Sequence, residues 1–287
     1  MKIEGSVAII TGGASGMGKA LAERIVSQGG KVLIADKDVA QGSALAEALN
    51  KKIGSTTVAV FHETDVTKWK TLEAAFDKAK EAFGKINIVV NNAGIADSST
   101  WVNDADPREE LSEYLVLNID LVAVAKGSRL AMQYFARNPQ VGEGVVVSTS
   151  SMYGLNNSGI VPLYAAAKAG IISLVRSLSM AREESNTRHV ALCPWFIDTP
   201  LLQSDFRQAL AAFKIQIMQP EPVIDAFIQA IEDDTLNGAI LTVLPHGTEV
   251  IRDNIYTGYP EGSEMLRAME TNLIKREFAN AKQDGRL

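Results

Sequence analysis

Tyr164 and Lys168 have the residue types and the spacing to move a proton. They lie four positions apart in the run Tyr164-Ala165-Ala166-Ala167-Lys168, so in a helix both side chains share one face. An ammonium group beside a phenol favours the phenolate and lowers the phenol pKa from its ordinary value of about 10. A tyrosine with such a neighbour can act as a general base near neutral pH. The same spacing also fits two surface residues of an amphipathic helix, so the pair alone is not specific.

Hydroxyl side chains follow a short apolar run that starts at Val145. The sequence Val145-Val146-Val147-Ser148-Thr149-Ser150-Ser151 predicts a buried strand with hydroxyl groups at its carboxyl end. Open α/β sheets bind their ligands at this end of the strands. We therefore expect these hydroxyl groups to lie at a ligand site.

A glycine-rich segment, Thr11-Gly12-Gly13-Ala14-Ser15-Gly16-Met17-Gly18, joins the first predicted strand to the first predicted helix. Glycines there allow a tight turn and a close approach of the backbone to a pyrophosphate, which the free N–H groups of the helix N-terminus can bind. The spacing differs from the general G-x-G-x-x-G pattern. A purely structural glycine turn is the alternative interpretation.

Asp36 ends the second predicted strand, 18 positions after Gly18. A carboxylate at this place can accept hydrogen bonds from both hydroxyls of an adenosine ribose, and it repels a 2′-phosphate. Asp36 and the non-basic Ser15 therefore predict NAD as the cofactor, whereas Lys37 points weakly towards NADP. The alternative role of Asp36 is to cap the helix that follows.

These residues require a scaffold in which buried strands alternate with helices. Nearly apolar runs predict strands at 7–11, 31–35, 57–61, 86–90, 145–148, 189–193 and 239–244, and helical spacing predicts helices at 18–28, 39–49, 72–83, 109–137, 164–182 and 222–232. This alternation predicts a single α/β domain over residues 1–245, a doubly wound, Rossmann-like parallel sheet flanked by helices. Beyond residue 245 the alternation ends, and 246–287 is predicted to be an extension with an amphipathic helix at 264–282. That helical tail either covers the site or contacts another subunit.

The composition limits the classes of function. Acidic residues number 34 and basic residues 28, so the formal net charge of −6 argues against nucleic acid or an anionic membrane as partner. One cysteine, Cys193, and three histidines exclude an internal disulfide and predict no metal site. No apolar run has the length of a signal-peptide core or a membrane helix, which predicts a soluble, cytoplasmic protein.

From about residue 3 to 245 the chain resembles the short-chain dehydrogenases/reductases. The motifs that carry the resemblance agree in order and spacing: the glycine loop 11–18, Asp65 after the third strand, Asn91-Asn92-Ala93-Gly94, Asn118, Ser151 and the Tyr164/Lys168 pair. Ser151 precedes Tyr164 by 13 residues, as the catalytic serine of this family does.

The resemblance implies a role for each matching residue. Tyr164 would be the acid/base, and Lys168 would bind the nicotinamide ribose and lower the pKa of Tyr164. Ser151 would orient the substrate oxygen, and Asn118 would position a water behind Lys168. The implied cofactor contacts are Gly12, Ser15, Gly16, Met17, Gly18, Asp36, Asp65, Val66, Asn91, Asn92, Ala93, Gly94, Tyr164, Lys168, Pro194 and Thr199. On the sequence alone, Asp65 could equally cap a helix, and Asn91 and Asn118 could be structural amides.

Three segments, 83–88, 192–199 and 231–240, resemble the NAD-dependent 15-hydroxyprostaglandin dehydrogenase branch of the family. Trp195 and Val161 depart from that branch, which has glycine and glutamine at these places, so the prostaglandin substrate does not follow. The segment 195–220 is apolar and is predicted to close over the substrate as a lid. Met152, Val161, Trp195 and Phe196 are the expected substrate contacts, which favour a hydrophobic secondary alcohol or ketone.

The predicted function is NAD-dependent interconversion of an alcohol and a ketone by hydride transfer. The helices 109–137 and 164–182 resemble the pair through which the family dimerises, with Ala123, Val124 and Ala166 as small outer residues, so we expect a homodimer or homotetramer. Two alternatives stay open: an NADP-dependent ketoreductase of a biosynthetic pathway, and a cofactor-binding regulatory protein without turnover.

Overall fold

A single sheet with helices on both faces forms the centre of the computed structural model, which describes residues 1–54, 57–96, 114–252 and 263–287. The strands are β1 (Val7–Thr11), β2 (Lys31–Asp36), β3 (Ala59–Glu63), β4 (Ile88–Asn91), β5 (Gly144–Thr149), β6 (Thr187–Pro194), β7 (Ile240–Leu244) and β8 (Gly247–Ile251). The main helices are α1 (Gly16–Ser27), α2 (Val39–Ile53), α3 (Trp69–Phe83), α5 (Ala123–Arg137), α6 (Pro162–Ser179), α8 (Ser204–Ala212), α9 (Glu221–Glu232) and α10 (Ser263–Gln283). Short helical pieces are α4 (Leu115–Leu117), the π-helical turn η2 (Asn118–Val122), η3 (Pro139–Val141), η4 (Met152–Gly154) and α7 (Arg182–Ser185).

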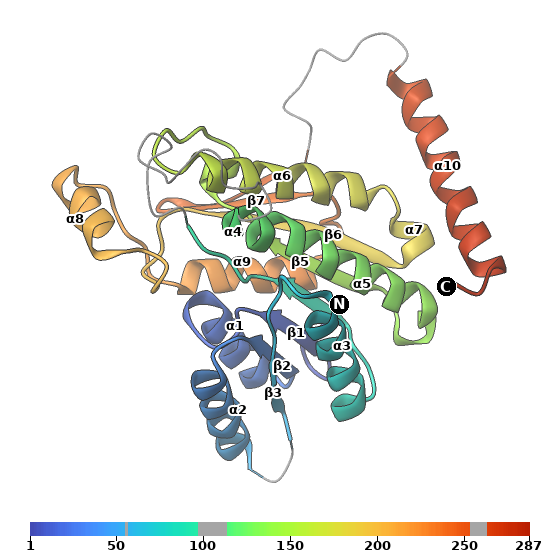
Figure 1. The fold of residues 1–287 in the computed structure, drawn as a ribbon, viewed down its shortest axis with the longest axis horizontal. Coiled ribbons are helices and arrows are strands. Elements are labelled where there is room, and N and C mark those ends of the chain that lie inside the picture. The colour runs from blue at the N-terminus through green and yellow to red at the C-terminus, as the bar shows by residue number, and fades with distance from the viewer. Residues whose placement is uncertain (55–56, 97–113, 253–262) are drawn as a thin grey trace.

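The strand order is β3-β2-β1-β4-β5-β6-β7-β8, and every neighbouring pair up to β7 is parallel. The order runs outward in both directions from β1 and β4, which is the doubly wound arrangement. The predicted Rossmann-like fold is therefore confirmed (Figure 1).

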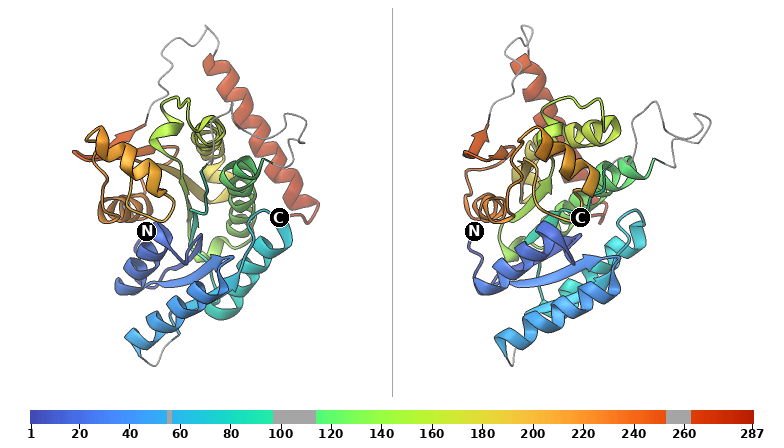
Figure 2. Two further views of the ribbon diagram at one scale, coloured as in Figure 1. Left: turned by 60° about the vertical axis from the view of Figure 1, so that its left-hand side comes forward. Right: turned by 90° about the vertical axis from the view of Figure 1, so that its left-hand side faces the viewer.

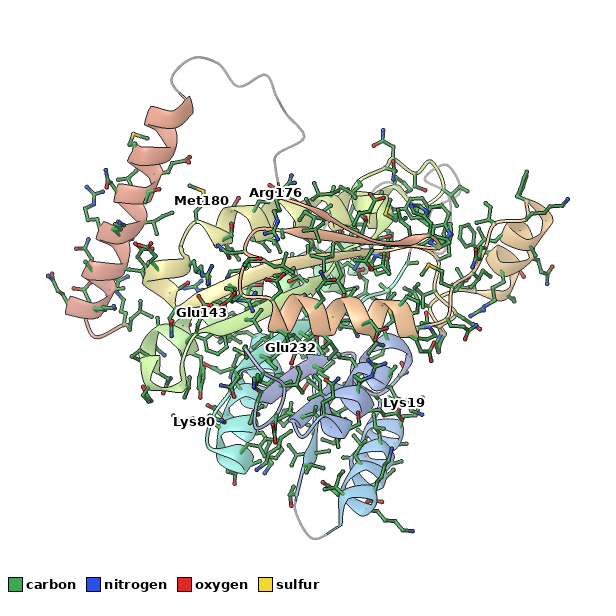
Figure 3. All side chains as sticks on the ribbon, turned by 180° about the vertical axis from the view of Figure 1, so that it is seen from behind. Lys19, Lys80, Glu143, Arg176, Met180 and Glu232 are labelled. Atoms are coloured by element: carbon green, nitrogen blue, oxygen red, sulfur yellow. The ribbon has the colours of Figure 1, made fainter. Side chains whose placement is uncertain are left out.

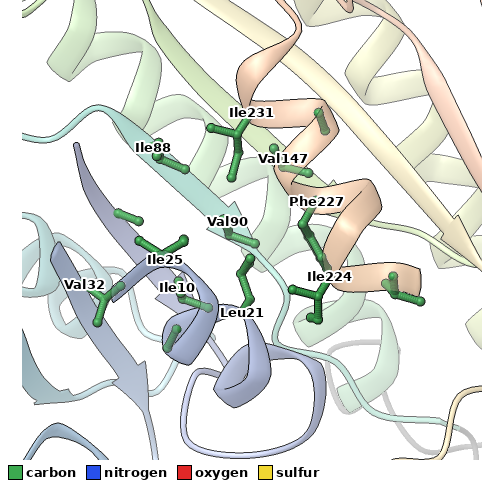
Figure 4. Packing of buried hydrophobic residues seen from close by; sticks show 14 of the residues in the cluster. Ile10, Leu21, Ile25, Val32, Ile88, Val90, Val147, Ile224, Phe227 and Ile231 are labelled. Carbon is green, nitrogen blue, oxygen red and sulfur yellow. The ribbon is translucent and has the colours of Figure 1, made fainter. Parts of the chain in front are cut away.

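The register of the strands sorts the core into two layers. Ile10 pairs with Ile34 and with Val90, and these residues pack with α1, α2 and α9 on one face of the sheet (Figure 4). Their chain neighbours Ile9 and Val89 point to the opposite face and pack with α3 and α5. Because both faces are covered, the central strands β1, β2, β4 and β5 are largely apolar rather than alternating, as their sequences predicted.

The sheet does not stop at the boundary expected from the sequence. Residues 247–251 form β8, which pairs antiparallel with β7 across the two-residue turn Pro245-His246. The sequence analysis did not predict this strand. β8 is an edge strand whose first three residues are exposed, so it lacks the apolar run that identified the buried strands.

The helix expected at 109–137 is described from residue 114 onward. It consists of α4, η2 and α5 in direct succession, with the π-helical turn between the two α-helical parts. Such turns insert an extra residue and are frequent at functional sites.

α8 and α10 lie at opposite ends of the molecule (Figures 1 and 2). α10 packs against α7, and the Arg137 side chain donates to the main-chain carbonyl of Arg286. Seen from behind, Glu143 and Met180 lie towards the end that carries α10, and Lys19 lies towards the other end (Figure 3). In the position that the structure gives it, α10 therefore does not cover the site of its own subunit, which was one of the two roles considered for the tail. Within the described ranges, no helix has the length and apolarity to cross a bilayer.

Arg188 on β6 joins the second half of the sheet to α9. The side chain is 1% exposed, and its Nε lies 3.3 Å from a carboxylate oxygen of Glu143, just before β5. Its guanidinium donates at 2.7 to 3.2 Å to four main-chain carbonyls, those of Ala230, Ile231, Asp233 and Leu236. These carbonyls belong to the last turn of α9 and the loop that follows, so a side chain takes the place of water at that helix end.

Candidate active site

A cavity of about 780 Å³ opens at the carboxyl ends of the parallel strands. Its walls come from the segments that follow β1, β2, β3, β4, β5 and β6, together with α6 and the lid around α8. The strand order reverses between β1 and β4, which is where sheets of this kind bind ligands.

The glycine loop forms one wall of this cavity. Gly12 has a φ of +63°, and a Cβ atom there would lie 2.8 Å from Cα of Ala93. A Cβ atom on Gly18 would collide with the carbonyl oxygen of Gly12, so α1 can begin this close to β1 only with glycine at position 18. Ser15 precedes α1 without capping it through its side chain, and the first turn contains no acidic residue. The positive end of α1 thus faces the cavity with main-chain donors available, which fits a pyrophosphate.

Asp36 lies at the edge of the cavity, where two main-chain N–H groups hold its carboxylate. Oδ2 accepts from Ala14 N at 3.0 Å, and Oδ1 accepts from Asp38 N at 3.1 Å. The residue that caps α2 is Asp38, which accepts from Gln41 N at 2.9 Å. The capping alternative for Asp36 is therefore wrong, and its carboxylate is directed along the loop that lines the cavity.

Asp65 and Val66 line the cavity after β3. The Asp65 carboxylate accepts from the Thr67 hydroxyl at 2.7 Å and from Thr67 N at 3.0 Å, and Lys68 Nζ lies 3.1 Å away. The hydrogen bond from the Thr67 hydroxyl is the main reason why the pKa of Asp65 lies below its ordinary value. Asp65 thus stabilises the turn before α3 as an anion.

The two asparagines after β4 have different places. Asn92 lines the cavity, and its side chain donates to the carbonyls of Thr11 and Gly12 at 3.1 and 3.2 Å, which ties the glycine loop to β4. Asn91 is buried inside the sheet and donates to Ser128 at 3.2 Å. The expectation that Asn91 lines the cofactor is therefore wrong, because its side chain points to the α5 face.

Tyr164, Lys168 and Ser151 meet on one wall of the cavity, as the sequence predicted. Lys168 Nζ lies 5.2 Å from the centre of the Tyr164 ring and donates to the carbonyl of Thr149 at 2.9 Å. Ser151 follows β5 and hydrogen-bonds with Tyr164. α6 supplies the tyrosine and the lysine from adjacent turns, so a parallel strand end and one helix face assemble the whole group.

Burial raises the pKa of the Tyr164 phenol above its ordinary value, and this is the largest effect on it. The Lys168 ammonium lowers that pKa, as expected, but the carboxylate of Asp120 raises it again. The net direction is upward, so the sequence-based expectation of a lowered pKa is wrong. For Lys168, burial acts to lower the pKa, but Asp120 and Tyr164 outweigh it and the net shift is upward.

The side chain beside Lys168 that sequence reasoning missed is Asp120. Its Oδ2 lies 3.0 Å from Lys168 Nζ, and both side chains are buried. Asn118, to which the sequence analysis gave the place behind Lys168, lies two residues earlier and is not among the residues that line the cavity. The available signal was a lone acidic residue between Ile119 and Leu121 in an apolar helical run, since a buried carboxylate requires a cation or several donors.

Aromatic rings form another wall of the cavity. The rings of Tyr164, Tyr153, Phe196 and Phe206 follow one another edge to face, with centroids 5.7 to 6.5 Å apart. Trp195 packs on Phe196 at 5.0 Å. Val161, Trp195 and Phe196 line the cavity as predicted, whereas Met152 does not and packs instead into the core beneath α6.

Arg207 of α8 holds the base of the lid. It donates to the carbonyls of Thr199 and Leu202 at 2.7 Å and pairs with Asp198 at 2.6 Å. An isolated bridge between Ile197 and Met218 joins the two ends of the segment. The predicted cofactor contacts Gly16, Met17, Ala93, Gly94, Pro194 and Thr199 also line the cavity, whereas Gly18 does not and packs against the Gly12 carbonyl.

Comparison with known proteins agrees with this geometry. A sequence model described as short chain dehydrogenase matches residues 6–210. The 15-hydroxyprostaglandin dehydrogenase (NAD(+)) of Mus musculus is 32% identical over 258 residues, which are 85% of this chain and 91% of that protein. The cis-4-hydroxycyclohexanecarboxylate dehydrogenase of Sinomonas cyclohexanicum is 33% identical over 244 residues, 83% of this chain and 94% of that protein. A crystal structure of 3-ketoacyl-(acyl-carrier-protein) reductase from Brucella melitensis complexed with NADH has a TM-score of 0.71 at 28% identity and covers 84% of this chain and 98% of that one.

Proposed function

The chain belongs to the short-chain dehydrogenase family, and we propose that it is an NAD-dependent oxidoreductase that interconverts a hydrophobic secondary alcohol and its ketone. One observation carries the proposal: Ser151, Tyr164 and Lys168 meet between a helix N-terminus suited to a pyrophosphate and a wall of aromatic rings. A dinucleotide and an apolar substrate could therefore both reach the same phenol.

The cofactor is proposed to be NAD. Gly12, Ser15, Gly16, Met17 and Gly18 would hold its pyrophosphate at the start of α1. Asp36 would accept hydrogen bonds from the adenosine ribose hydroxyls, and Asp65 and Val66 would lie at the adenine. Support for NAD over NADP comes from the anchored Asp36 carboxylate and from the relatives, one named for NAD(+) and one solved with NADH. Bound NAD supplies the acceptor for a hydride.

Proton transfer would fall to Tyr164. In the direction of oxidation, the substrate hydroxyl gives its proton to the Tyr164 phenolate while the carbinol carbon loses a hydride, which leaves a carbonyl group. Ser151 would hold the substrate oxygen, and the Lys168 ammonium would stabilise the phenolate and bind the nicotinamide ribose. Reduction of a ketone runs through the same groups in reverse, with Tyr164 as the acid.

The substrate is proposed to be apolar near the reacting carbon. Val161, Trp195 and Phe196 line this part of the cavity, together with Tyr153 and Phe206. The names of the relatives contain a hydroxy or a keto group on quite different frameworks, a prostaglandin, a cyclohexanecarboxylate and an acyl chain. They support alcohol and ketone chemistry and leave the framework to experiment.

A panel of secondary alcohols and ketones, assayed with NAD(H) and NADP(H) by absorbance at 340 nm, tests the proposal. We expect turnover of apolar alcohols with NAD, and loss of that turnover in Tyr164→Phe. Turnover with NADP(H) alone would instead favour the ketoreductase alternative. Tight NAD binding without turnover of any compound would favour the regulatory alternative.

Self-association through α5 and α6 is part of the proposal. Ala166 is exposed on α6, and Val122 and Leu115 expose 41% and 53% of their surface on the preceding helical segment. Ala123 and Val124, expected on the outside, are buried within the subunit, so they are not contact residues. Light scattering should show a homodimer or homotetramer, and a monomer at assay concentration would refute this part.

A further inference from the structure

Asp120 is a fully buried carboxylate directly beside the proposed proton-transfer pair. Its side chain is 0% exposed, that of Lys168 is 3% exposed, and Oδ2 and Nζ are 3.0 Å apart. Charged side chains are rarely buried to this extent unless they are paired, because removing a charge from water is costly. A helix that only covers the sheet would have an apolar residue here, like its neighbours Ile119 and Leu121.

The second oxygen of Asp120 is also used. Oδ1 accepts from Ile95 N at 2.9 Å, in the cavity-lining segment that follows β4. Next to Ile95, Gly94 leaves room for the carboxylate, since a Cβ atom there would lie 3.0 Å from Oδ2. Asp120 therefore joins three elements: the π-helical turn η2, the segment after β4 and α6.

The π-helical turn places Asp120 in this position. η2 spans Asn118–Val122, with Asp120 at its centre. An extra residue in the turn rotates the side chains that follow relative to a regular helix. Asp120 is the one charged residue of this turn, and its side chain points at Lys168.

We propose that Asp120 is a positioning residue for proton transfer: its buried carboxylate holds the Lys168 ammonium beside Tyr164 and offsets the positive charge that the phenol faces. The inference rests on the proposed function for its catalytic meaning, but the charge coupling itself can be measured without turnover.

The charges around Tyr164 give the expected direction. Four groups face the Tyr164 phenol. They are the Lys168 ammonium on the same helix, the Asp120 carboxylate on η2, the Ser151 hydroxyl after β5 and the Cys193 thiol on β6. Of these, only Lys168 and Asp120 carry charge at neutral pH, and their opposite charges cancel. Without the carboxylate the site becomes net positive, so the phenolate forms more readily.

Asp120→Asn is the informative variant because it removes the charge and preserves the shape. The single asparagine oxygen can still accept from Lys168 at the cost of the hydrogen bond from Ile95 N, and the carbonyl of Thr149 continues to accept from Lys168. Asp120→Glu keeps the charge. Glu143→Gln is the matched control, since Glu143 is a carboxylate paired with Arg182 and Arg188 and does not line the cavity.

The test is a pH titration of phenolate absorbance near 295 nm, with the same titration of each protein in a Tyr164→Phe background subtracted. The difference isolates Tyr164 from the other tyrosines. Asp120→Asn should lower the Tyr164 midpoint by about one pH unit or more, the usual scale for one nearby charge. Asp120→Glu and Glu143→Gln should keep the wild-type midpoint. The pH profile of kcat for alcohol oxidation should shift in parallel.

If circular dichroism shows that Asp120→Asn is folded, an unchanged or raised Tyr164 midpoint in that variant would overturn the proposal. This holds even if activity falls, because replacing a merely structural residue would also lower activity without lowering the midpoint. An equal shift in Glu143→Gln would also overturn it. A lowered midpoint in proteins that oxidise no alcohol would support the charge coupling and refute the proposed function, so the two failures can be told apart.

Discussion

Asp36→Asn should relax the preference for NAD over NADP. Asp36 is half-buried at the rim of the cavity, with its carboxylate fixed by Ala14 N and Asp38 N at 3.0 and 3.1 Å. The substitution removes the charge, and its remaining carbonyl oxygen can keep one of these two bonds. NADP differs from NAD by a 2′-phosphate on the ribose that Asp36 is proposed to bind, so the wild-type carboxylate and the phosphate would repel each other.

The size of the effect follows from the exposure of Asp36. Two unit charges about 4 Å apart interact by about 1 kcal/mol in bulk water and about 4 kcal/mol at the effective dielectric constant near a protein surface. A half-buried carboxylate lies between these limits. Each 1.4 kcal/mol is a factor of ten in affinity, so wild type should prefer NAD by roughly 5- to 700-fold, and Asp36→Asn should remove most of that ratio.

Titration of NAD and NADP by quenching of tryptophan fluorescence gives both dissociation constants, and Trp195 lines the cavity as a reporter. Asp38→Asn is the control, because it also removes one negative charge, only two residues from Asp36. The Asp38 side chain caps α2 and does not line the cavity. Equal or tighter binding of NADP by wild type would refute the reasoning. So would equal changes of the ratio in Asp36→Asn and Asp38→Asn, since the effect would then be one of net charge.

Four further changes have defined outcomes. Tyr164→Phe should lower kcat by about 10²–10⁴-fold and leave NAD binding intact, because it removes only the hydroxyl; steady-state rates within a few-fold of wild type would exclude Tyr164 as the acid/base. Wild-type oxidation should accelerate with rising pH as Tyr164 loses its proton, and Lys168→Met should move that rise to higher pH, since Lys168 lowers the pKa of Tyr164. Deletion of residues 264–287 should leave a folded, NAD-binding protein, and a melted far-ultraviolet circular dichroism spectrum would show that α10 is part of the core. Gly18→Ala should weaken NAD binding by tenfold or more or unfold the domain, because its Cβ atom meets the Gly12 carbonyl; wild-type affinity and thermal midpoint would contradict this.

Local patterns predicted the parts of the site that are local in the chain. The glycine loop and the Tyr164/Lys168 pair each lie within a few residues, and a strand end or one helix face sets their geometry. β1 to β7 were likewise predictable because burial on both faces leaves an apolar run. β8 has one neighbour and three exposed residues, so pairing with β7 rather than hydrophobicity makes it a strand.

Asp120 and Asn91 show where sequence reasoning fails. The contact of Asp120 with Lys168 joins positions 48 residues apart through a π-helical turn, and regular helical periodicity does not represent such a turn. The family motif pointed to Asn118 as the residue that positions a water behind Lys168, and it gave no role to Asp120. Asn91 and Asn92 are adjacent and chemically identical, but strand alternation sends one into the sheet and the other to the cavity. The register of β4 decides which asparagine side chain points into the cavity, and only the folded sheet defines that register.

The hydrogen bonds of the buried Arg188 side chain make the central part of the chain depend on residues that are synthesised later. Its four carbonyl acceptors lie at 230–236, more than 40 residues downstream, and without them a buried guanidinium would have only the Glu143 carboxylate for compensation. The buried Arg188 side chain on β6 is therefore fully compensated only when α9 is docked, and we expect the second half of the sheet to form in one cooperative step. A fragment that ends near residue 210, where the match to the family sequence model stops, would lack these acceptors together with β7 and β8. We therefore expect the unit that folds to be larger than the region that the family sequence model matches.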